Sequence, residues 1–492
     1  MTGAIVLDGG TLTSTAVATV ARDGASVELA PAARARNREA REAIAALLER
    51  GEPLYGATTG VGALRDRTIS DAERERFQWN LLRSHAVSAG RPVEPELVRA
   101  GMVVRANQLG AGGAGVAPAL LDRLIVALND GITPLTREFG SLGTGDLPAL
   151  ADIALALLGE GQVWSGNRLI DAPAPAPPIR LGLRDGLGFM SSGAMTAGQA
   201  ALASVDARAL QARWLEVAAL SFEALAADPV VLDPRVQAAR GARGQAAVAA
   251  TMRELLAGAP FDPRSPDRLV QDPYPFRVLP QVDGVARDAL DDLDEVLRRE
   301  LNARPENALI HEGRALPTGN FHAAEVGAAL DSLRAAFAHS ASLIAGRVSA
   351  LLDPRMSGLE PFLAGDPGPD SGHMMLEYTA HAAAAEVRSL AMPMAVQSVW
   401  ASLGVESHAS LAATAAVRAA QMLEAMEVLV ATELVVAARA LRMAGRVPAG
   451  AGVQRLYAAA ELALPRGLED RRFGQDVEAA RSLLGQTAEG LG

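Results

Sequence analysis

The chain has 492 residues, of which 49% are hydrophobic, and this length suits two or three average domains or one large helical domain. Its net charge is −11 and it has no basic block, which argues against nucleic acid and anionic membrane surfaces as partners. The sequence shows no targeting leader and no uncharged apolar run near 18 residues, so we expect a cytoplasmic protein without a membrane span.

Two residue types are missing, and their absence restricts the chemistry. The chain has no cysteine, which excludes thiol nucleophiles, thiolate zinc sites and iron–sulfur clusters, and we predict no metal. All 46 basic residues are arginine, so pyridoxal phosphate (PLP) has no lysine to anchor it. Chemistry on an amine must therefore find its electrophile elsewhere.

The first part of the chain predicts loops and helices of moderate length. Residues 1–30 are expected to form an irregular cap, with alternating residues at 27–29. A glycine-rich loop at 54–62 carries Tyr55, one of only four tyrosines. We predict helices at 32–49, 95–109 and 119–129. A further helix should begin at a capping box at 70–73 and end at about His85.

A glycine-rich turn precedes the next apolar run. Gly143 and Gly145 break the backbone around Thr144, and Asp146 is a good N-cap for a helix with Pro148 in its first turn. The turn should therefore lie at the positive end of a helix dipole. Such a turn can hold an anion, or it can bring the backbone into a strained, reactive geometry.

The rest of the chain is dominated by long helical patterns. Residues 160–182 are rich in Pro and Gly and predict an ordered connection. Two of the patterns after residue 288, at 323–352 and 412–443, exceed 25 residues. They are apolar on more than one face, which indicates burial in a bundle or at a subunit interface. We therefore expect a mainly α, oligomeric protein, with helical stretches at 187–225, 288–301, 323–352, 375–390 and 412–443.

Several short motifs in the same order together resemble the aromatic amino acid ammonia-lyase family, which includes histidine, phenylalanine and tyrosine lyases and their aminomutase relatives. Histidine lyases are the most similar members. The similarity covers most of the chain. The motifs lie at residues 55–62, 139–147, 271–277, 319–322, 351–359 and 406–410.

The resemblance implies a nearly all-helical homotetramer with active sites built from several subunits. It implies one lyase-like domain over 1–492, with the loops of the site in an N-terminal region (1–190) and a helical bundle in 191–492. It also implies the missing electrophile. In that family an Ala-Ser-Gly triad cyclises and loses water to give a methylidene-imidazolone (MIO), and the matching residues here are Gly143, Thr144 and Gly145.

The resemblance also assigns catalytic roles. Tyr55 matches the base that takes the β-proton, Tyr274 a helper tyrosine, and Arg277 the clamp for the substrate carboxylate. A tyrosine acts as a base near neutral pH only in positive surroundings. Glu406 matches the glutamate of histidine lyases, where phenylalanine enzymes carry Gln.

Further positions match the substrate pocket. Asn307 matches an amide that helps to hold the substrate, Phe321 lies in the matched Gly-Asn-Phe-His, and Ser191 stands beside the position of the ring. His85 falls where the family selects the substrate side chain, and Ser-His at this point is similar to histidine lyases. The substrate implied is thus an aromatic or heteroaromatic amino acid, histidine-like by preference.

The sequence departs from the family at the chemistry. Thr144 replaces Ser, so that dehydration would leave an ethylidene group, and the turn is one residue shorter. Four further positions differ from the family. Thr58 and Ser191 each replace an Asn, Val405 replaces a Gln and Ser407 replaces an Asp. These changes make the groups around the electrophile smaller and favour a divergent member.

Three hypotheses follow for the function. The first is an ammonia-lyase or aminomutase that uses the cyclised triad. The second is an acid–base enzyme without the ring that eliminates, cyclises or isomerises through Tyr55, Tyr274 and Glu406. The third is a pseudoenzyme that acts as an assembly partner, and it leaves the retained tyrosines, Arg277 and Glu406 without a purpose.

Overall fold

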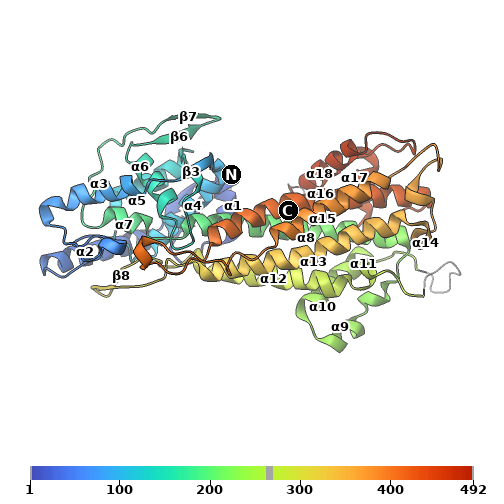
Figure 1. The fold of residues 1–492 in the computed structure, drawn as a ribbon, viewed down its shortest axis with the longest axis horizontal. Helices are drawn as coiled ribbons and strands as arrows, with labels where there is room; N and C mark the ends of the chain where they lie inside the picture. The colour runs from blue at the N-terminus through green and yellow to red at the C-terminus, as the bar shows by residue number, and fades with distance from the viewer. Residues whose placement is uncertain (1–2, 262–269, 490–492) are drawn as a thin grey trace. The chain divides into compact units, whose positions relative to one another are not determined.

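The structure is a computed structural model that describes residues 3–261 and 270–489. The chain forms two compact units, each built from three segments. Unit 1 comprises Met1–Val205, Leu293–Asp331 and Pro393–Val417, and unit 2 comprises Asp206–Asp292, Ser332–Met392 and Arg418–Gly492. Figure 1 shows helices as the main element of both, and the predicted mainly α fold is confirmed.

Unit 1 combines short helices with small strand pairs (Figure 1). Strand β1 (Ile5–Leu7) is parallel to β2 (Val27–Leu29), and β3 (Ala89–Pro92) is antiparallel to β5 (Arg137–Phe139). A three-stranded antiparallel sheet has the order β4 (Thr133–Pro134), β6 (Gln162–Ser165) and β7 (Arg168–Asp171). Strands β8 (Leu309–His311) and β9 (Arg314–Leu316) form a hairpin. Its helices are α1 (Ser14–Arg22), α2 (Pro31–Glu49), α3 (Arg74–His85), α4 (Pro95–Gly110), α5 (Pro118–Asn129), α6 (Leu147–Leu157) and α7 (Asp185–Met190).

The core of unit 1 surrounds α4, in which every residue from Val98 to Gly110 is buried. A helix that is apolar nearly all round has no face for solvent, and the polar side chains on α4 must find partners inside. Arg105, Asn107 and Gln108 therefore form buried hydrogen bonds to neighbouring segments. This core gives the loops of the unit a fixed base.

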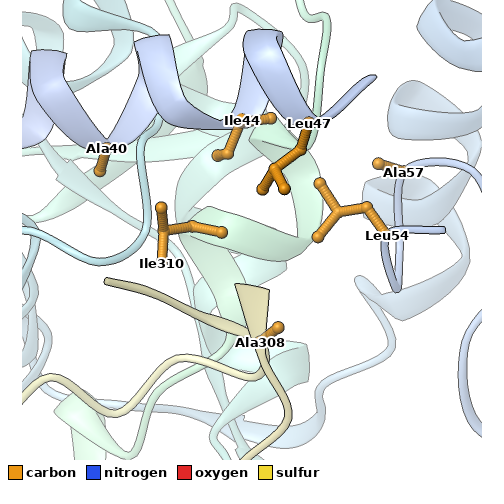
Figure 2. Packing of buried hydrophobic residues seen from close by; sticks show 7 residues of the cluster. All are labelled: Ala40, Ile44, Leu47, Leu54, Ala57, Ala308 and Ile310. Carbon is orange, nitrogen blue, oxygen red and sulfur yellow. The ribbon is translucent and has the colours of Figure 1, made fainter. Parts of the chain in front are cut away.

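A second apolar cluster lies under the loop that carries Tyr55 (Figure 2). Ile44 and Leu47 of α2 point toward Leu54, the residue before Tyr55, and toward Ile310 of β8. Each such side chain contributes roughly 1.5–3 kcal/mol when fully buried. The cluster consists of Ala40, Ile44, Leu47, Leu54, Ala57, Ala308 and Ile310.

The prediction of an irregular cap at residues 1–30 is wrong, because α1 spans Ser14–Arg22. Thr13 caps this helix by accepting a hydrogen bond from the N–H of Ala16 at 3.2 Å. Val17 and Val20 are buried three residues apart, as one face of a helix requires. The stretch is only nine residues long, which makes its periodicity easy to miss.

Unit 2 is almost entirely helical, and four long helices contribute residues to both units. The predicted long helices are confirmed, although α12 begins at Leu279 and not near residue 288. Helices within unit 2 are α9 (Pro234–Arg240), α10 (Arg243–Leu255), α11 (Tyr274–Arg277), α14 (Pro354–Ser357), α15 (Met374–Leu390), α17 (Gln454–Ala463) and α18 (Gly474–Glu489). The shared helices are α8 (Ala194–Leu225), α12 (Leu279–Glu300), α13 (Ala324–Leu352) and α16 (Ala412–Met443).

Helix α13 is the one described helix whose length and composition would allow it to cross a membrane. Its most apolar window is 61% buried inside the protein. Packing of this kind is what the core helix of a globular fold shows.

Inside unit 2, a buried ion pair joins two of the long helices. Arg347 of α13 donates from Nε and a terminal nitrogen to the two carboxylate oxygens of Glu433 on α16, at 2.6 and 2.9 Å. Ser221 of α8 adds a third hydrogen bond to Glu433 at 2.6 Å. Both charged side chains are fully buried, so the attraction between them offsets the free-energy cost of removing each charge from water.

Candidate active site

The turn at residues 143–145 has a backbone that glycine alone accepts easily. Gly143 and Gly145 have φ values of +77° and +93°, and Thr144 between them is half-buried. The Gly143 carbonyl accepts hydrogen bonds from Ala323 N–H at 3.1 Å and from the Ser410 hydroxyl at 2.9 Å. Within residues 3–261 and 270–489, no hydrogen bond engages the N–H of Thr144 or of Gly145.

Asp146 stands at the start of α6 as predicted, but its side chain does not cap the helix. The carboxylate instead accepts hydrogen bonds from the hydroxyl of Ser141 at 2.5 Å and from Thr196 N–H at 2.7 Å. Thr196 Oγ1 donates a third bond at 2.9 Å. Complete burial raises the pKa of Asp146 in spite of these donors. Asp146 thus ties both sides of the turn to α8.

A second acid lies beside Asp146 within unit 1. Burial, and then the charge of Asp146, raise the pKa of Glu300 to about 7. A methyl group placed on Gly193 would lie 3.8 Å from Glu300 Oε1, so the carboxyl faces the segment that follows Ser191 and Ser192. Two adjacent buried acids do not both ionise readily, so Glu300 holds a proton up to neutral pH.

The Tyr55 loop is braced at several points. The phenol oxygen of Tyr55 accepts a hydrogen bond from Gly62 N–H at 2.8 Å, which leaves its own hydrogen free for another partner. Thr58 Oγ1 accepts a hydrogen bond from Leu54 N–H at 2.8 Å and so braces the residue before Tyr55. Gln78 of α3 donates to the Gly56 carbonyl at 2.9 Å.

Arg184 joins the Tyr55 loop to the segment that carries Asn307. Its guanidinium donates to the carbonyls of Tyr55 at 3.0 Å, of Ala308 at 3.2 Å and of Asn307. Ser191 Oγ accepts from Asn307 N–H at 3.1 Å. Burial lowers the pKa of Arg184 to about 10, so it remains charged at neutral pH. Three of the predicted residues are thus linked by hydrogen bonds. Arg184 bonds the carbonyls of Tyr55 and Asn307, and Ser191 bonds the N–H of Asn307.

Glu406 lies on the other side of the Tyr55 loop. A methyl group on Gly62 would lie 4.0 Å from Glu406 Oε1 and 2.6 Å from Ser402 Oγ. Ser402 Oγ also accepts from Ala63 N–H at 3.1 Å, which fixes the two segments together. Gly62 therefore has the Tyr55 phenol on its N–H, and a carboxylate oxygen of Glu406 lies 4.0 Å from where its β-carbon would stand.

His85 is the last residue of α3 and is half-buried. Its Nδ1 lies 2.8 Å from the Leu81 carbonyl, which assigns the hydrogen to Nδ1 and leaves Nε2 as an acceptor. No hydrogen bond among the described residues links His85 to Tyr55 or to the 143–145 turn. Its role in choosing the substrate remains a prediction.

Tyr274 and Arg277 belong to unit 2, at the two ends of the short helix α11. The Arg277 guanidinium stacks over the Tyr274 ring at 4.6 Å and donates to the side chain of Gln271. Tyr274 is 64% exposed, so its phenol is open to a partner. The roles of helper tyrosine and carboxylate clamp remain predictions for this pair.

Two histidines that the sequence reasoning gave no role lie together in unit 1. His322 Nε2 and His408 Nδ1 are 3.0 Å apart, and the ring centroids are 5.0 Å apart. His322 follows the half-buried Phe321, and His408 lies two residues after Glu406. Both were within matched motifs, and the chain has only seven histidines, which was the available signal.

These features can be compared with known proteins. The sequence model of the aromatic amino acid lyase family matches residues 12–461. A histidine ammonia-lyase from Anaeromyxobacter sp. (strain K) is 38% identical over 498 residues, which are 98% of each chain. Ergothionase from Treponema denticola has a TM-score of 0.93 at 28% identity over 99% of both chains. Tyrosine aminomutase from Streptomyces globisporus has a TM-score of 0.93 at 30% identity, over 99% of this chain and 98% of its own.

The chain therefore belongs to the aromatic amino acid lyase family. Its reaction is that of a carbon–nitrogen lyase, the elimination of ammonia from an amino acid. The predicted family and class of reaction are confirmed, and neither the ring-free enzyme nor the pseudoenzyme is favoured.

The residues at the turn fit the self-made ring that the family implies. Ring closure needs a nucleophilic nitrogen at position 145 and an electrophilic carbonyl at position 143. Gly145 has an N–H outside any hydrogen bond of the described residues, and the Gly143 carbonyl has two donors on its oxygen. Among the described residues, no group of three or more His, Asp or Glu side chains is placed to hold a metal ion.

Proposed function

We propose that the protein releases ammonia from a histidine-like L-α-amino acid and gives the α,β-unsaturated acid. The observation that carries this proposal is the meeting of Tyr55 and Glu406 at Gly62. A base and a carboxylate at one short loop are what an elimination needs when a proton leaves carbon and an amino group becomes ammonium. The 38% identity to histidine ammonia-lyases supports the choice of amino acid.

Tyr55 is the group that takes the β-proton in this proposal. The hydrogen bond from Gly62 N–H to its phenol oxygen fixes the position of that oxygen. The nearby guanidinium of Arg184 adds a positive charge to the same loop. Glu406 would take a proton from the substrate's amino or imidazole group in this proposal, which would favour a histidine-like substrate over phenylalanine.

The remaining predicted residues position the substrate. The side-chain oxygen of Asn307 accepts a bond from Thr318 N–H at 3.2 Å, so its amide N–H₂ is directed as a donor. His85 offers Nε2 as an acceptor for an imidazole N–H. Arg277 would hold the carboxylate through a bidentate pair. When formed from residues 143–145, the ring supplies the electrophile that receives the substrate.

The direct test is turnover of purified protein with L-His, L-Tyr and L-Phe. We expect an acrylate product, seen by its ultraviolet absorbance, with L-His preferred, and loss of the product in Tyr55→Phe. Chromatography for a β-amino acid separates a lyase from an aminomutase. No product with any of the three amino acids would refute the proposal.

We also propose a homotetramer in which a second subunit supplies Tyr274 to the site, because its side chain is 64% exposed. Light scattering tests the tetramer. Coexpression of Tyr55→Phe and Tyr274→Phe chains tests the sharing. If the two phenols come from different subunits, some sites in mixed tetramers hold both tyrosines and activity returns. If one subunit supplies both, the mixture stays inactive.

A further inference from the structure

We infer that Ser410 is a positioning residue for ring closure, because its hydroxyl polarises the Gly143 carbonyl that Gly145 must attack. This inference rests on the proposed ring and concerns how it forms. It comes from the contacts around one oxygen. Ser410 Oγ donates to the Gly143 carbonyl oxygen at 2.9 Å, and Ala323 N–H donates to the same oxygen at 3.1 Å.

Two donors on one carbonyl oxygen form an oxyanion hole. Such donors matter most where the surroundings exclude water, and Gly143, Ser410 and Ala323 are all buried. The N–H groups of Thr144 and Gly145 have no hydrogen-bond partner among the described residues. The Gly145 nitrogen can therefore react without first breaking a hydrogen bond. The turn therefore has an activated carbonyl and an uncommitted nitrogen two residues apart.

The step balances without any other reagent. The Gly145 nitrogen bonds to the Gly143 carbonyl carbon. The Gly143 oxygen leaves as water with the hydrogens of the Gly145 and Thr144 nitrogens. Thr144 then loses its hydroxyl and its α-hydrogen as a second water. Nothing is oxidised or reduced, and the chain loses about 36 Da.

The glycine at position 143 fits Ser410 closely. A methyl group on Gly143 would lie 2.1 Å from Ser410 Oγ and 2.9 Å from the backbone nitrogen of Ala412. Alanine, which the family carries in its triad, would therefore displace the hydroxyl from the carbonyl that it serves. The departure from the family at residue 143 and the position of Ser410 are two parts of one arrangement.

The two donor segments are held to each other. His322 precedes Ala323, His408 lies two residues before Ser410, and their ring nitrogens are 3.0 Å apart. The backbone adds a further link, because Leu411 N–H donates to the Leu142 carbonyl at 2.9 Å. The donors are thus fixed on a frame that also holds the turn, as preorganised stabilisation requires.

Ser410 has a second role that the test must separate. Its Oγ accepts from Ala412 N–H at 3.3 Å, where α16 begins. Loss of such a cap lowers stability and by itself leaves ring chemistry alone. A readout of ring formation that does not depend on activity is therefore needed, and intact mass provides it.

The experiment follows intact mass over time after a short expression pulse. Wild type should lose about 36 Da, and Ser410→Ala should do so about 100-fold more slowly, the cost of one such donor. Ser410→Cys keeps a side chain of similar shape, slightly larger, with a much weaker donor, and should also be slow. Ser342→Ala, at an exposed serine of α13, should match wild type. Circular dichroism checks that each variant is folded.

Each result is decisive. A wild type that loses the mass together with a folded Ser410→Ala that loses it equally fast overturns this inference and leaves the ring intact. A wild-type protein that keeps its full mass overturns both the proposed ring and the role of Ser410 in forming it. If Ser410→Ala does not fold, Ser410→Cys decides by the same comparison, and a rate equal to wild type refutes the role of the hydroxyl.

Discussion

Both units bury an arginine against a glutamate, but the two pairs are used differently. In unit 2, Arg347 forms two hydrogen bonds to Glu433, and the pair joins two helices that have their own backbone hydrogen bonds. In unit 1, Arg105 meets Glu306 through a single contact of 3.2 Å, and Glu306 Oε2 has no partner in the described structure. Burial therefore raises the pKa of Glu306.

Two buried arginines of unit 1 donate to several backbone carbonyls. Arg105 bonds the carbonyls of Gly188 and Phe189, and Arg184 bonds those of Tyr55, Asn307 and Ala308. These carbonyls lie in loops or at the end of α7, where regular structure leaves them unsatisfied. The comparison teaches that the Arg347–Glu433 pair joins elements that are already formed, whereas Arg105 and Arg184 give shape to segments that carry the site. Unit 2 also has a buried arginine of the second kind, since Arg439 donates to the carbonyls of Leu363 and Leu468.

The largest effect is expected at Arg184. Arg184→Met removes three carbonyl contacts and leaves Glu306 with less compensation, so we expect a loss of about 3–5 kcal/mol in unfolding free energy. The elimination rate of the folded fraction should fall at least ~100-fold, because Tyr55 and Asn307 lose their common support. Urea unfolding and kcat measure the two effects. Arg184→Lys keeps the charge without the planar fork and should rescue stability more than rate.

The pair in unit 2 should behave in the opposite way. Glu433→Gln leaves Arg347 buried without its charge partner and should cost about 3–5 kcal/mol in unfolding free energy. The double change Arg347→Met with Glu433→Leu should recover most of that loss, with kcat per folded protein close to wild type. Chemical denaturation of the three proteins checks this. A double variant as unstable as the single one would show that the pair itself is required.

Glu300 should make the unfolding free energy of the protein depend on pH, which the Arg347–Glu433 pair of unit 2 is not expected to do. Burial and Asp146 raise its pKa from 4.5 to about 7, so between these values the folded protein holds a proton that the unfolded chain releases. Stability from this group is therefore lost as pH rises from 4.5 to 7. Glu300→Gln should gain about 2–3 kcal/mol relative to wild type between pH 5 and pH 8. Urea unfolding at both pH values measures it.

A control for that result lies on the same helix. Hydrogen bonds from Arg298 lower the pKa of the exposed Glu295 to about 2, below the range of the measurement. Glu295→Gln should therefore show no change in relative stability between pH 5 and pH 8. An equal slope in the Glu295 and Glu300 variants would contradict the assignment to burial.

The sequence predicted the helices of both units better than the loops of the site. Continuous apolar patterns such as 323–352 and 412–443 appear as α13 and α16 with nearly the same bounds. Arg184 gave no such signal, because its partners are backbone carbonyls far along the chain. The side chain of Asp146 was expected to cap a helix, and tertiary contacts to Ser141 and Thr196 took it instead.

The predicted site was limited in the same way. The family resemblance named Tyr55, Asn307 and Glu406, but their order in the sequence carries no information on which groups meet. Ser410 lies within the motif at 406–410, but the motif assigns it no role, since a hydroxyl donates to whichever carbonyl the fold places beside it. Long-range hydrogen bonds between loops follow from the packed core and not from local pattern.

The smallest effect is expected at Thr58, which braces the loop that Arg184 anchors. Thr58→Val removes the acceptor of Leu54 N–H and should cost about 1 kcal/mol in unfolding free energy. Because Leu54 precedes Tyr55, kcat should also fall, by no more than about tenfold. Thr58→Ser keeps the hydroxyl and should match wild type in both measurements. An undiminished kcat in Thr58→Val would mean that Arg184 and the apolar cluster under the loop hold Tyr55 without help from the hydroxyl.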